Sequence, residues 1–428
     1  MWTGLVSMLS AVAAANGPSA SPGKDIALVI VEAGRHERVD TPVLVPASTA
    51  APWAQILPPG GSAQRTFELL EEGQGASSKP LLAQWQTSTD PPMKASGAGA
   101  LVFTLAGKTP AGSVRRFRLR AADRVVSTKD VQVEDDKGKA LLFRHAGRSI
   151  AKYNYGLVQK EPGKRNVFDR MAYFHPVWAP CGQIITDDFP ESHPHQRGLF
   201  FAWTRAKIGK YKADFWNLKA RRGRTLHKRL DRVGGGPVFG GFVADNDCVA
   251  NNRVAIKETW VGRIYACPTG PWIVDFDIRH TAADQDVVLA KYPYGGMAYR
   301  GRPEWLGAKR PKIEASDGYD ARKGRTEGAR WVDMAGVLPT GGEAGLTLID
   351  HPSNPTYPTA VRIHPGMPYF CYAFAQREAY TIKAGESLEL RYRCVVHDGP
   401  PDRKLNDRWA ADFVDPPKVT LEPVGKAK

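Results

Sequence analysis

One segment, from Asp187 to Trp203, concentrates residues that can do chemistry. It reads Asp-Asp-Phe-Pro-Glu-Ser-His-Pro-His-Gln-Arg-Gly-Leu-Phe-Phe-Ala-Trp, with three acids, two histidines and an arginine ahead of an apolar run. Two prolines restrict its backbone, and rigid loops beside strands are common positions for binding and catalytic groups. His193 and His195 could transfer protons, and Arg197 could hold a carboxylate or hydroxyl oxygen through two hydrogen bonds. The alternative is a solvated loop whose histidines cap neighbouring backbone.

A second candidate pair, Glu258 and His280, lies on two alternating segments that we expect to form a hairpin. If its turn centres on Pro268 and Thr269, the two side chains face each other among apolar neighbours. Burial would raise the proton affinity of an unpaired carboxylate there, and a neighbouring imidazole would counter that. The pair could act as a general acid and base. A structural ion pair, or a register shifted by one residue, is the alternative.

A third candidate is the dyad of Asp350 and His351, in the stiff loop Asp350-His-Pro-Ser-Asn-Pro355 after an apolar strand. The aspartate could orient the imidazole for proton transfer. In a proline-rich turn, the same pair could instead be a cap or turn former.

Composition and periodicity predict the elements that must position these groups. The chain has 428 residues, with 42 glycines, 33 prolines and 10% aromatic residues, which favours an all-β protein of more than one domain. We expect a small immunoglobulin-like β-sandwich over residues 24–135, a charged boundary at residues 134–139, and a large antiparallel β-sandwich over residues 140–400. Helical periodicity is not evident, and residues 401–428 are expected to be a tail.

The charge is uneven: of the net +15, residues 24–138 carry +1 and residues 139–428 carry +14. The strongest basic excess runs from Arg205 to Arg232. No helix-turn-helix, zinc-finger or RNA-binding signature accompanies it, so we expect a solvated basic surface and no nucleic-acid partner.

The N-terminal segment and the cysteines bear on the cellular compartment. Residues 1–23 contain an apolar run that ends in small residues near Ala15, which resembles a secretory signal although no Lys or Arg precedes it. We therefore expect an exported, periplasmic or extracellular protein without a membrane span. The five cysteines have no C-x-x-C spacing, which excludes a zinc ribbon and a dense disulfide framework but leaves one disulfide open.

Four ordered motifs resemble one bacterial family, labelled "methane oxygenase PmoA-like" and functionally uncharacterised, over about residues 140–400. They are Asp188-Phe-Pro-Glu-Ser-His-Pro-His-Gln-Arg-Gly198, Asp214-Phe-Trp216, Leu348-Ile-Asp-His-Pro-Ser-Asn-Pro355, and Ile382-Lys-Ala-Gly-Glu-Ser-Leu-Glu-Leu-Arg-Tyr-Arg393 with Val396-His397. The label does not fit a methane monooxygenase subunit, which needs several transmembrane helices that this sequence lacks. The resemblance implies carbohydrate and keto-sugar chemistry. Gln196 stands where the family usually has a second adjacent histidine, which shifts the expected roles to its neighbours.

The leading hypothesis is a carbohydrate-processing enzyme, a lyase, hydrolase or epimerase that acts on a sugar or oxidised sugar by His/Glu acid–base chemistry. Its catalytic candidates are His193, His195, Arg197, Glu258, His280 and His351; its substrate-binding candidates are Asp188, Trp203, Asp214, Trp216, Arg300 and Asp350. Both tryptophans would stack on the sugar ring. The alternative is a non-catalytic carbohydrate-binding or surface protein. No organic cofactor is expected, and a divalent metal on the His-x-His pair would need a third ligand.

Overall fold

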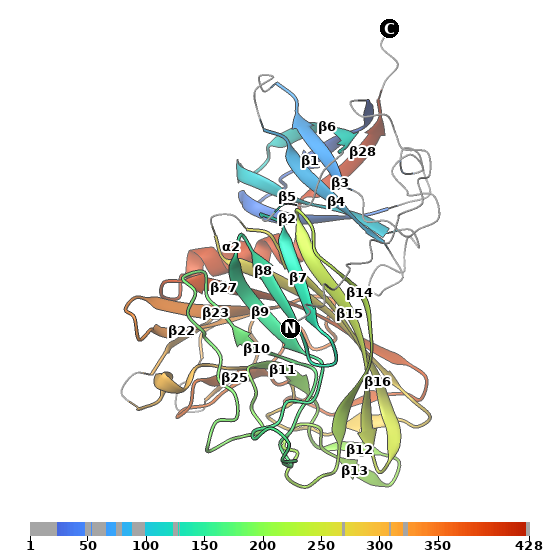
Figure 1. Ribbon diagram of the computed structural model, residues 1–428, viewed down its shortest axis with the longest axis vertical. Coiled ribbons are helices and arrows are strands. Elements are labelled where there is room, and N and C mark those ends of the chain that lie inside the picture. Colours follow the sequence, from blue (N-terminus) through green and yellow to red (C-terminus); the bar gives the residue numbers. More distant parts are fainter. Residues whose placement is uncertain are drawn as a thin grey trace, which may run out of the picture.

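The computed structural model describes residues 24–47, 53, 66–73, 79–87, 99–122, 127, 129–267, 270–307, 310–319 and 324–424. The expected leader at residues 1–23 and the turn at Pro268 and Thr269 lie outside these ranges. Within them the chain is nearly all β, as predicted, and the strands form four antiparallel sheets (Figure 1).

The first sheet has seven strands that surround a core of their own. In spatial order they are β2 (Arg38–Pro46), β5 (Gly99–Thr109), β4 (Leu81–Thr87), β3 (Thr66–Glu71), β6 (Val114–Ala121), β1 (Asp25–Glu32) and β28 (Lys418–Pro423). In β6 the arginines alternate with Phe117 and Leu119, both fully buried, so one face of this strand meets the core.

The larger body consists of two sheets with the main core between them. One has nine strands: β21 (Arg325–Thr326), β24 (Val361–Ile363), β25 (Tyr369–Tyr372), β19 (Gly296–Arg300), β11 (Leu199–Ala202), β10 (Tyr173–Val177), β9 (Arg148–Asn154), β8 (Ala140–His145) and β7 (Val131–Asp136). The other has eight: β14 (Arg224–Gly234), β15 (Phe239–Ala250), β16 (Arg253–Tyr265), β17 (Trp272–Ala282), β27 (Ser387–Asp398), β23 (Glu343–Asp350), β22 (Trp331–Val337) and β20 (Lys312–Ala315). A four-stranded sheet adds β13 (Tyr211–Ala213), β12 (Ala206–Ile208), β18 (Val287–Leu289) and β26 (Tyr380–Ile382).

The eight-stranded sheet has two buried faces with different neighbours. Its inner face, with Trp260 and Phe276, belongs to the main core against the nine-stranded sheet. Its outer face, with Tyr265 and Val395, belongs to a second cluster that includes residues of the N-terminal sheet and of the helix that follows β27. A side chain on one face is therefore separated from a side chain on the other by the sheet itself.

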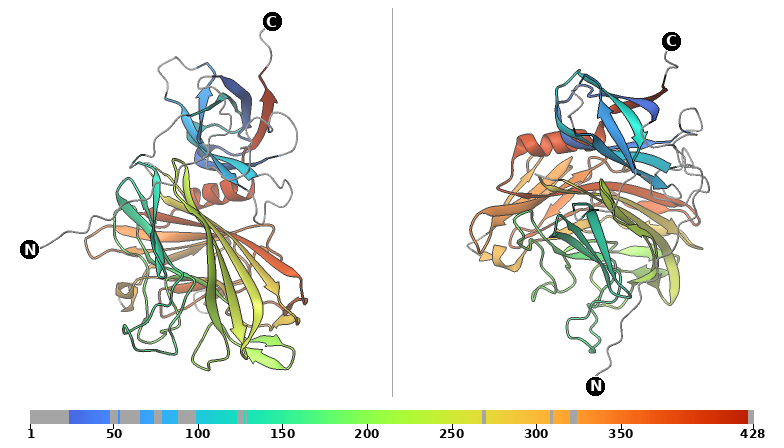
Figure 2. Two further views of the ribbon diagram at one scale, coloured as in Figure 1. Left: turned by 45° about the vertical axis from the view of Figure 1, so that its right-hand side comes forward. Right: turned by 45° about the horizontal axis from the view of Figure 1, so that its top comes forward.

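The expectation of a tail over residues 401–428 is wrong for residues 403–423, which form a helix and a strand. Residues 403–414 form the helix α2 (Arg403–Val414), which lies between the N-terminal sheet and the larger body (Figure 2), and β28 then pairs with β1. The carboxylate of Asp402 caps the helix by accepting from the backbone nitrogens of Lys404 and Leu405. Trp409 and Phe413 are spaced by one helical turn, and both side chains are buried in the second cluster.

The expected boundary near residue 136 is also displaced. β7 already belongs to the nine-stranded sheet, and residues 137–139 form the turn of the β7–β8 hairpin. The N-terminal sheet is joined to the larger body by buried contacts, among them hydrogen bonds from the Gln84 amide to the backbone of Phe239 and from Arg263 to Gln86.

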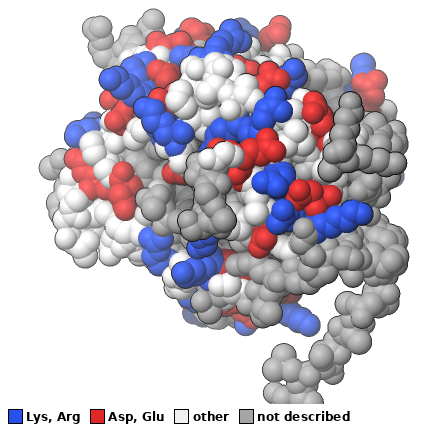
Figure 3. All heavy atoms as spheres, turned by 90° about the horizontal axis from the view of Figure 1, so that it is seen from above, with Lys and Arg blue, Asp and Glu red and all other residues white. Residues whose placement is uncertain are grey.

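The structure bears on the predictions made from the charges and the cysteines. On the face seen from above in Figure 3, basic and acidic side chains are interspersed. In the basic segment, Arg229 pairs with Asp245 of β15 at 2.8 Å; the expected lack of nucleic-acid binding stays a prediction.

All five cysteines are free. Among the described residues, no helix is long and apolar enough to cross a membrane.

Candidate functional site

Backbone hydrogen bonds within the loop over residues 187–198 add to the restriction that its two prolines impose. The loop enters β11 through Gly198, which has a φ of 53° and no room for a Cβ beside the carbonyl of Phe174. Backbone bonds close the loop from within: Gln196 N donates to His193 O at 2.9 Å, and Gly198 N donates to Asp187 O at 2.8 Å. The histidines are therefore held by local backbone structure.

Three half-buried imidazoles converge beside this loop. The ring centroid of His193 lies 5.7 Å from that of His195 and 6.0 Å from that of His364. His364 lies in the loop between β24 and β25, so the nine-stranded sheet brings together two segments that are far apart in sequence.

Local hydrogen bonds orient two of these rings. The Nδ1 of His193 lies 3.0 Å from the hydroxyl of Ser192, and the Nδ1 of His364 accepts from the backbone nitrogen of Gly366 at 3.1 Å. The Nε2 of both rings has no hydrogen-bond partner in the described part of the chain. These nitrogens are therefore available to a ligand.

Arg300 is the buried cation of this cluster. Its Nε lies 3.4 Å from the carboxylate of Asp187, and its Nη1 donates to the Oε1 of Gln196 at 3.0 Å and contacts the sulfur of Met367 at 3.3 Å. Within the described residues Nη2 has no partner. The amide of Gln196, at the position where the sequence departs from the family pattern, thus holds the guanidinium that acts on all three imidazoles.

Burial and positive charge keep the three imidazoles neutral at pH 7. Burial, with the nearby charge of Arg170, lowers the pKa of His195 to about 4. Burial, with the charge of Arg362, lowers the pKa of His364 to about 4. Burial and then Arg300 lower the pKa of His193. Each ring therefore carries an unprotonated nitrogen that can accept a proton.

Arg197 and Asp188, predicted to meet the substrate, instead bind each other. Arg197 is fully buried; its Nε donates to Asp188, and its Nη1 donates to the carbonyl oxygen of Phe168 at 2.9 Å. Its Nη2 donates to the hydroxyl of Tyr173 and to Asp188. With four hydrogen bonds donated inside the protein, the guanidinium holds the loop rather than a ligand.

The predicted sugar-stacking tryptophans are core residues. Trp203 is 3% exposed and packs edge-on against Phe374, and Trp216 is 2% exposed and packs against Phe200. Asp214 is also structural, because its Oδ1 accepts from the backbone nitrogens at 216 and 217 and so caps a turn. The two tryptophans therefore expose no ring face to a sugar, and the carboxylate of Asp214 is engaged by hydrogen bonds within its turn.

Glu258 and His280 face each other as predicted. The register pairs them across β16 and β17, with Glu258 Oε2 2.8 Å from His280 Nε2 and Glu258 Oε1 accepting from Asn246 at 3.0 Å. They are 4% and 0% exposed, and the ring of His280 packs against Phe201 and Trp203. In the described chain neither contacts the three imidazoles, so the pair is an internal polar contact of the main core.

His351 lies on the other side of the eight-stranded sheet. Its ring packs on Phe413 of α2 at 5.0 Å, and its Nε2 lies 3.3 Å from Nη1 of Arg391. Asp350 does not orient it: this buried carboxylate accepts from Asn354 at 2.6 Å and from the backbone of Thr359 at 2.8 Å, and burial raises its pKa to about 6. His351 and the Glu258–His280 pair, expected among the catalytic residues, therefore do not form one site with the histidines of the 187–198 loop.

The contact between Ser353 and His351 has the length of a nucleophile–base pair, with 2.8 Å between Oγ and Nδ1. Burial, followed by the charge of Arg391, lowers the pKa of His351 to about 4. An imidazole that must become cationic beside a guanidinium is a poor general base. The hydrogen bond between His351 and Ser353 therefore stabilises a turn of the loop.

His364 is the site residue that sequence reasoning missed. The signal was available, since His364-Pro365-Gly366-Met367-Pro368 is a second proline-stiffened loop before an apolar strand. Among the described residues, no group of three or more His, Cys, Asp or Glu side chains is arranged to hold a metal ion. The three neutral imidazoles could accept protons, and the guanidinium of Arg300 could attract an anion.

Comparison with known proteins adds a family. No curated protein matches the sequence. Two solved structures are similar in part: an alpha-mannosidase from Enterococcus faecalis V583 (9% identity, TM-score 0.38, 94% of this chain and 46% of that one) and a protein in the glycosyl hydrolase family 38 from Enterococcus faecalis (9%, 0.38, 95% and 48%). The chain spans about half the length of these structures. A family model matches residues 140–410, which include both loops of the histidine cluster, and the chain thus belongs to DUF6807, a family of unknown function.

Proposed function

We propose that the chain is an acid–base enzyme that acts on a carboxylated sugar, such as a uronate, and removes the proton on the carbon next to the carboxylate. The observation that carries the proposal is the convergence of three neutral imidazoles on a buried guanidinium, Arg300. The resemblance to the PmoA-like family, with its implied carbohydrate and keto-sugar chemistry, supports a sugar as the substrate.

The roles follow from charge. The positive charge of Arg300 would attract the substrate carboxylate and stabilise the negative charge that develops on it as the neighbouring proton leaves. One imidazole would accept that proton and become an imidazolium. In a lyase this imidazolium would return the proton to the leaving oxygen; in an epimerase, a second imidazole that takes a proton from solvent while the anionic substrate is bound would donate it to the opposite face of the carbon.

Substrate binding would also tune the base. A pKa near 4, as for His195 and His364, makes an imidazole a weak base at neutral pH. An anion bound between Arg300 and the rings would offset the positive charge that disfavours protonation and so raise both pKa values towards neutrality. Neutral sugars would not do this, so the site is expected to select against them.

The test is solvent exchange. The full chain is incubated in D2O with oligogalacturonate or, as the neutral comparison of similar linkage, with maltotriose, and deuterium incorporation and unsaturated products are followed by NMR. Deuterium at the carbon next to the carboxylate, or an unsaturated uronate, is expected only with the acidic sugar. Binding of the uronate without either product would favour the carbohydrate-binding alternative, and cleavage of the neutral sugar would contradict the proposal.

A further inference from the structure

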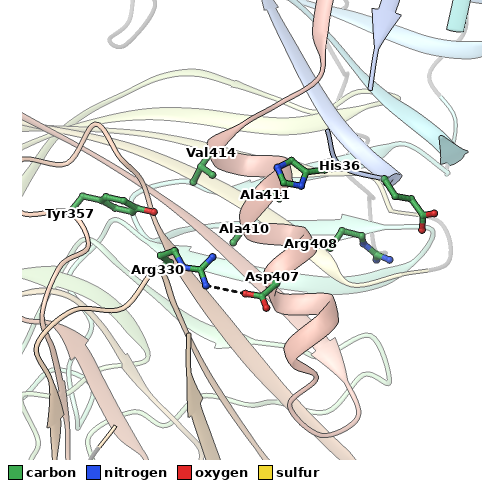
Figure 4. A pocket seen from close by; sticks show the side chains of 9 residues that line it. His36, Arg330, Tyr357, Asp407, Arg408, Ala410, Ala411 and Val414 are labelled. Carbon is green, nitrogen blue, oxygen red and sulfur yellow. Dashed lines mark hydrogen bonds and ion pairs between the residues drawn. The ribbon is translucent and has the colours of Figure 1, made fainter. Parts of the chain in front are cut away.

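A cavity of about 450 Å³ lies beside α2, away from the residues of the histidine cluster (Figure 4). Its walls come from four segments of the chain: the turn between β1 and β2, two loops of the larger body, and the helix. Arg330 and Tyr357 come from the loops, and Asp407 lies on the helix. The volume falls within the range of about 300–1,000 Å³ that small-molecule sites occupy.

Buried polar contacts hold these walls in place. Arg38 of β2 is fully buried and donates to Asp412 of α2 at 2.9 Å, and Thr41 donates to the same carboxylate at 3.0 Å. On the other side of the helix, Asn406 donates to Asp333 of β22 at 2.8 Å. A cavity between fixed elements needs little ordering when a ligand binds.

The charges around the cavity balance. Two guanidinium groups, of Arg330 and Arg408, stand with two carboxylates, of Glu37 and Asp407. The histidine cluster, by contrast, surrounds a buried arginine. A balanced lining does not select for a net charge on the ligand, so the fitting ligand is neutral.

The polar groups present both donors and acceptors. Arg330 Nη2 lies 3.4 Å from Asp407 Oδ1, and these side chains are 45% and 42% exposed. Trp331 Nε1 also donates to that oxygen, at 2.9 Å, which orients the carboxylate. Asp407 Oδ2 has no partner within the described chain and can accept from a hydroxyl, while the guanidinium can donate to one.

The apolar surface completes the match. The half-buried ring of Tyr357, together with alanine and valine side chains of α2, lines the same cavity. A pyranose has apolar C–H faces and an edge of hydroxyls that both donate and accept hydrogen bonds, which suits such a lining. We propose that this cavity is a second site, which binds a neutral saccharide. The inference does not depend on the proposed function, because it rests on other residues.

Calorimetry on the full chain tests this site, with cellobiose as the neutral saccharide, digalacturonate as its anionic counterpart and adenosine as a flat aromatic ligand. Cellobiose is expected to bind at micromolar to millimolar concentration. Loss of the aromatic wall in Tyr357→Ala should weaken it about tenfold, and Asp407→Asn should weaken it several-fold. Ala411→Gln, which adds a side chain inside the cavity from the helix surface, gives the same test without altering the loops.

Asp286→Asn is the matched control, since Asp286 is an acid paired with Lys383 at 2.8 Å outside the cavity lining. It should leave cellobiose binding unchanged. The second site is refuted if cellobiose does not bind at millimolar concentration, if adenosine or digalacturonate binds more tightly to this cavity, or if the control weakens binding as much as Asp407→Asn. A failure here leaves the exchange activity towards uronates untouched, so the two proposals can be separated.

Discussion

Glu258 and His280 face each other across neighbouring strands, and a carboxylate oxygen of the first lies 2.8 Å from Nε2 of the second. Both side chains are enclosed by the main core, and Asn246 satisfies the other carboxylate oxygen. The pair contributes to stability because removal of either partner would leave the other buried without this hydrogen bond.

Glu258→Ala is therefore expected to lower the free energy of unfolding by about 3–5 kcal/mol. Urea-induced unfolding followed by tryptophan fluorescence measures the change. Glu389→Ala is the matched control, because the side chain of Glu389 is 44% exposed where it pairs with Arg279 on the outer face of the same sheet, and exposed pairs contribute less than about 1 kcal/mol. A loss at Glu258 no larger than the control would show that the core does not need the pair.

Replacement of the clustered imidazoles should affect turnover rather than folding. His195→Asn and His364→Asn are each expected to reduce the rate of proton exchange on a uronate by about 10²–10⁴-fold, since each removes a group that transfers a proton. Their melting temperatures should stay near that of the wild type, because both rings are only half-buried. His227→Asn, at a half-buried histidine of β14 outside the cluster, serves as the control. A large drop in melting temperature with unchanged exchange would contradict the proposed role.

The same two histidines should make the protein acid-sensitive. Their pKa values are about 4 in the folded protein against an ordinary value of 6.5, so between these limits the unfolded chain binds more protons than the folded one. Stability therefore rises with pH across this window, and it falls as the pH drops from 6.5 to 4. The double variant His195→Asn/His364→Asn should show a shallower fall in melting temperature over this range, whereas Ser192→Ala should keep the slope of the wild type. Equal slopes in all three proteins would rule out the histidines as the cause.

The positive charge of Arg300 lowers the pKa values of the three clustered histidines. A double variant, Arg300→Gln with Asp187→Asn, removes the guanidinium without leaving its buried partner charged. The pKa values of His193, His195 and His364 should then rise, since Arg300 lowers all three. Histidine C–H resonances followed by NMR through a pH titration would measure this. Uronate binding should weaken in the same variant, and an increase in affinity would contradict the assigned role of the cation.

Much of the β structure could be predicted because alternation along a strand is a local property. The hairpin of β16 and β17 was predicted from alternation, and the register that opposes Glu258 and His280 followed from it. The helix α2 was missed, although Trp409 and Phe413 are one turn apart, because a short helix carries only three or so periodic residues.

The site was only partly predictable because contacts between loops depend on how sheets stack. His193 and His195 were identified from their own loop, whereas His364 joins them through the pairing of β19 with β25 and of β25 with β24. His351 could not be placed on the outer face of its sheet from its sequence neighbours. Arg197 resembled a ligand-binding residue because nothing local reveals that Tyr173 and Phe168 would take its donors.

The pairing of β28 with β1 has a consequence for the order of folding. During synthesis β1 is made early and β28 after every other strand described here. Val31 therefore has no Val419 to pair with until almost the whole chain has been made. Until then β1 can pair on its β6 side only, and its other edge presents unpaired backbone groups to the surroundings. Closing so long a loop adds little to the equilibrium cost, because that cost grows only with the logarithm of length, but such distant contacts slow folding. The sheet that begins the chain is therefore completed last, and nascent chains are exposed to edge-to-edge association until β28 arrives.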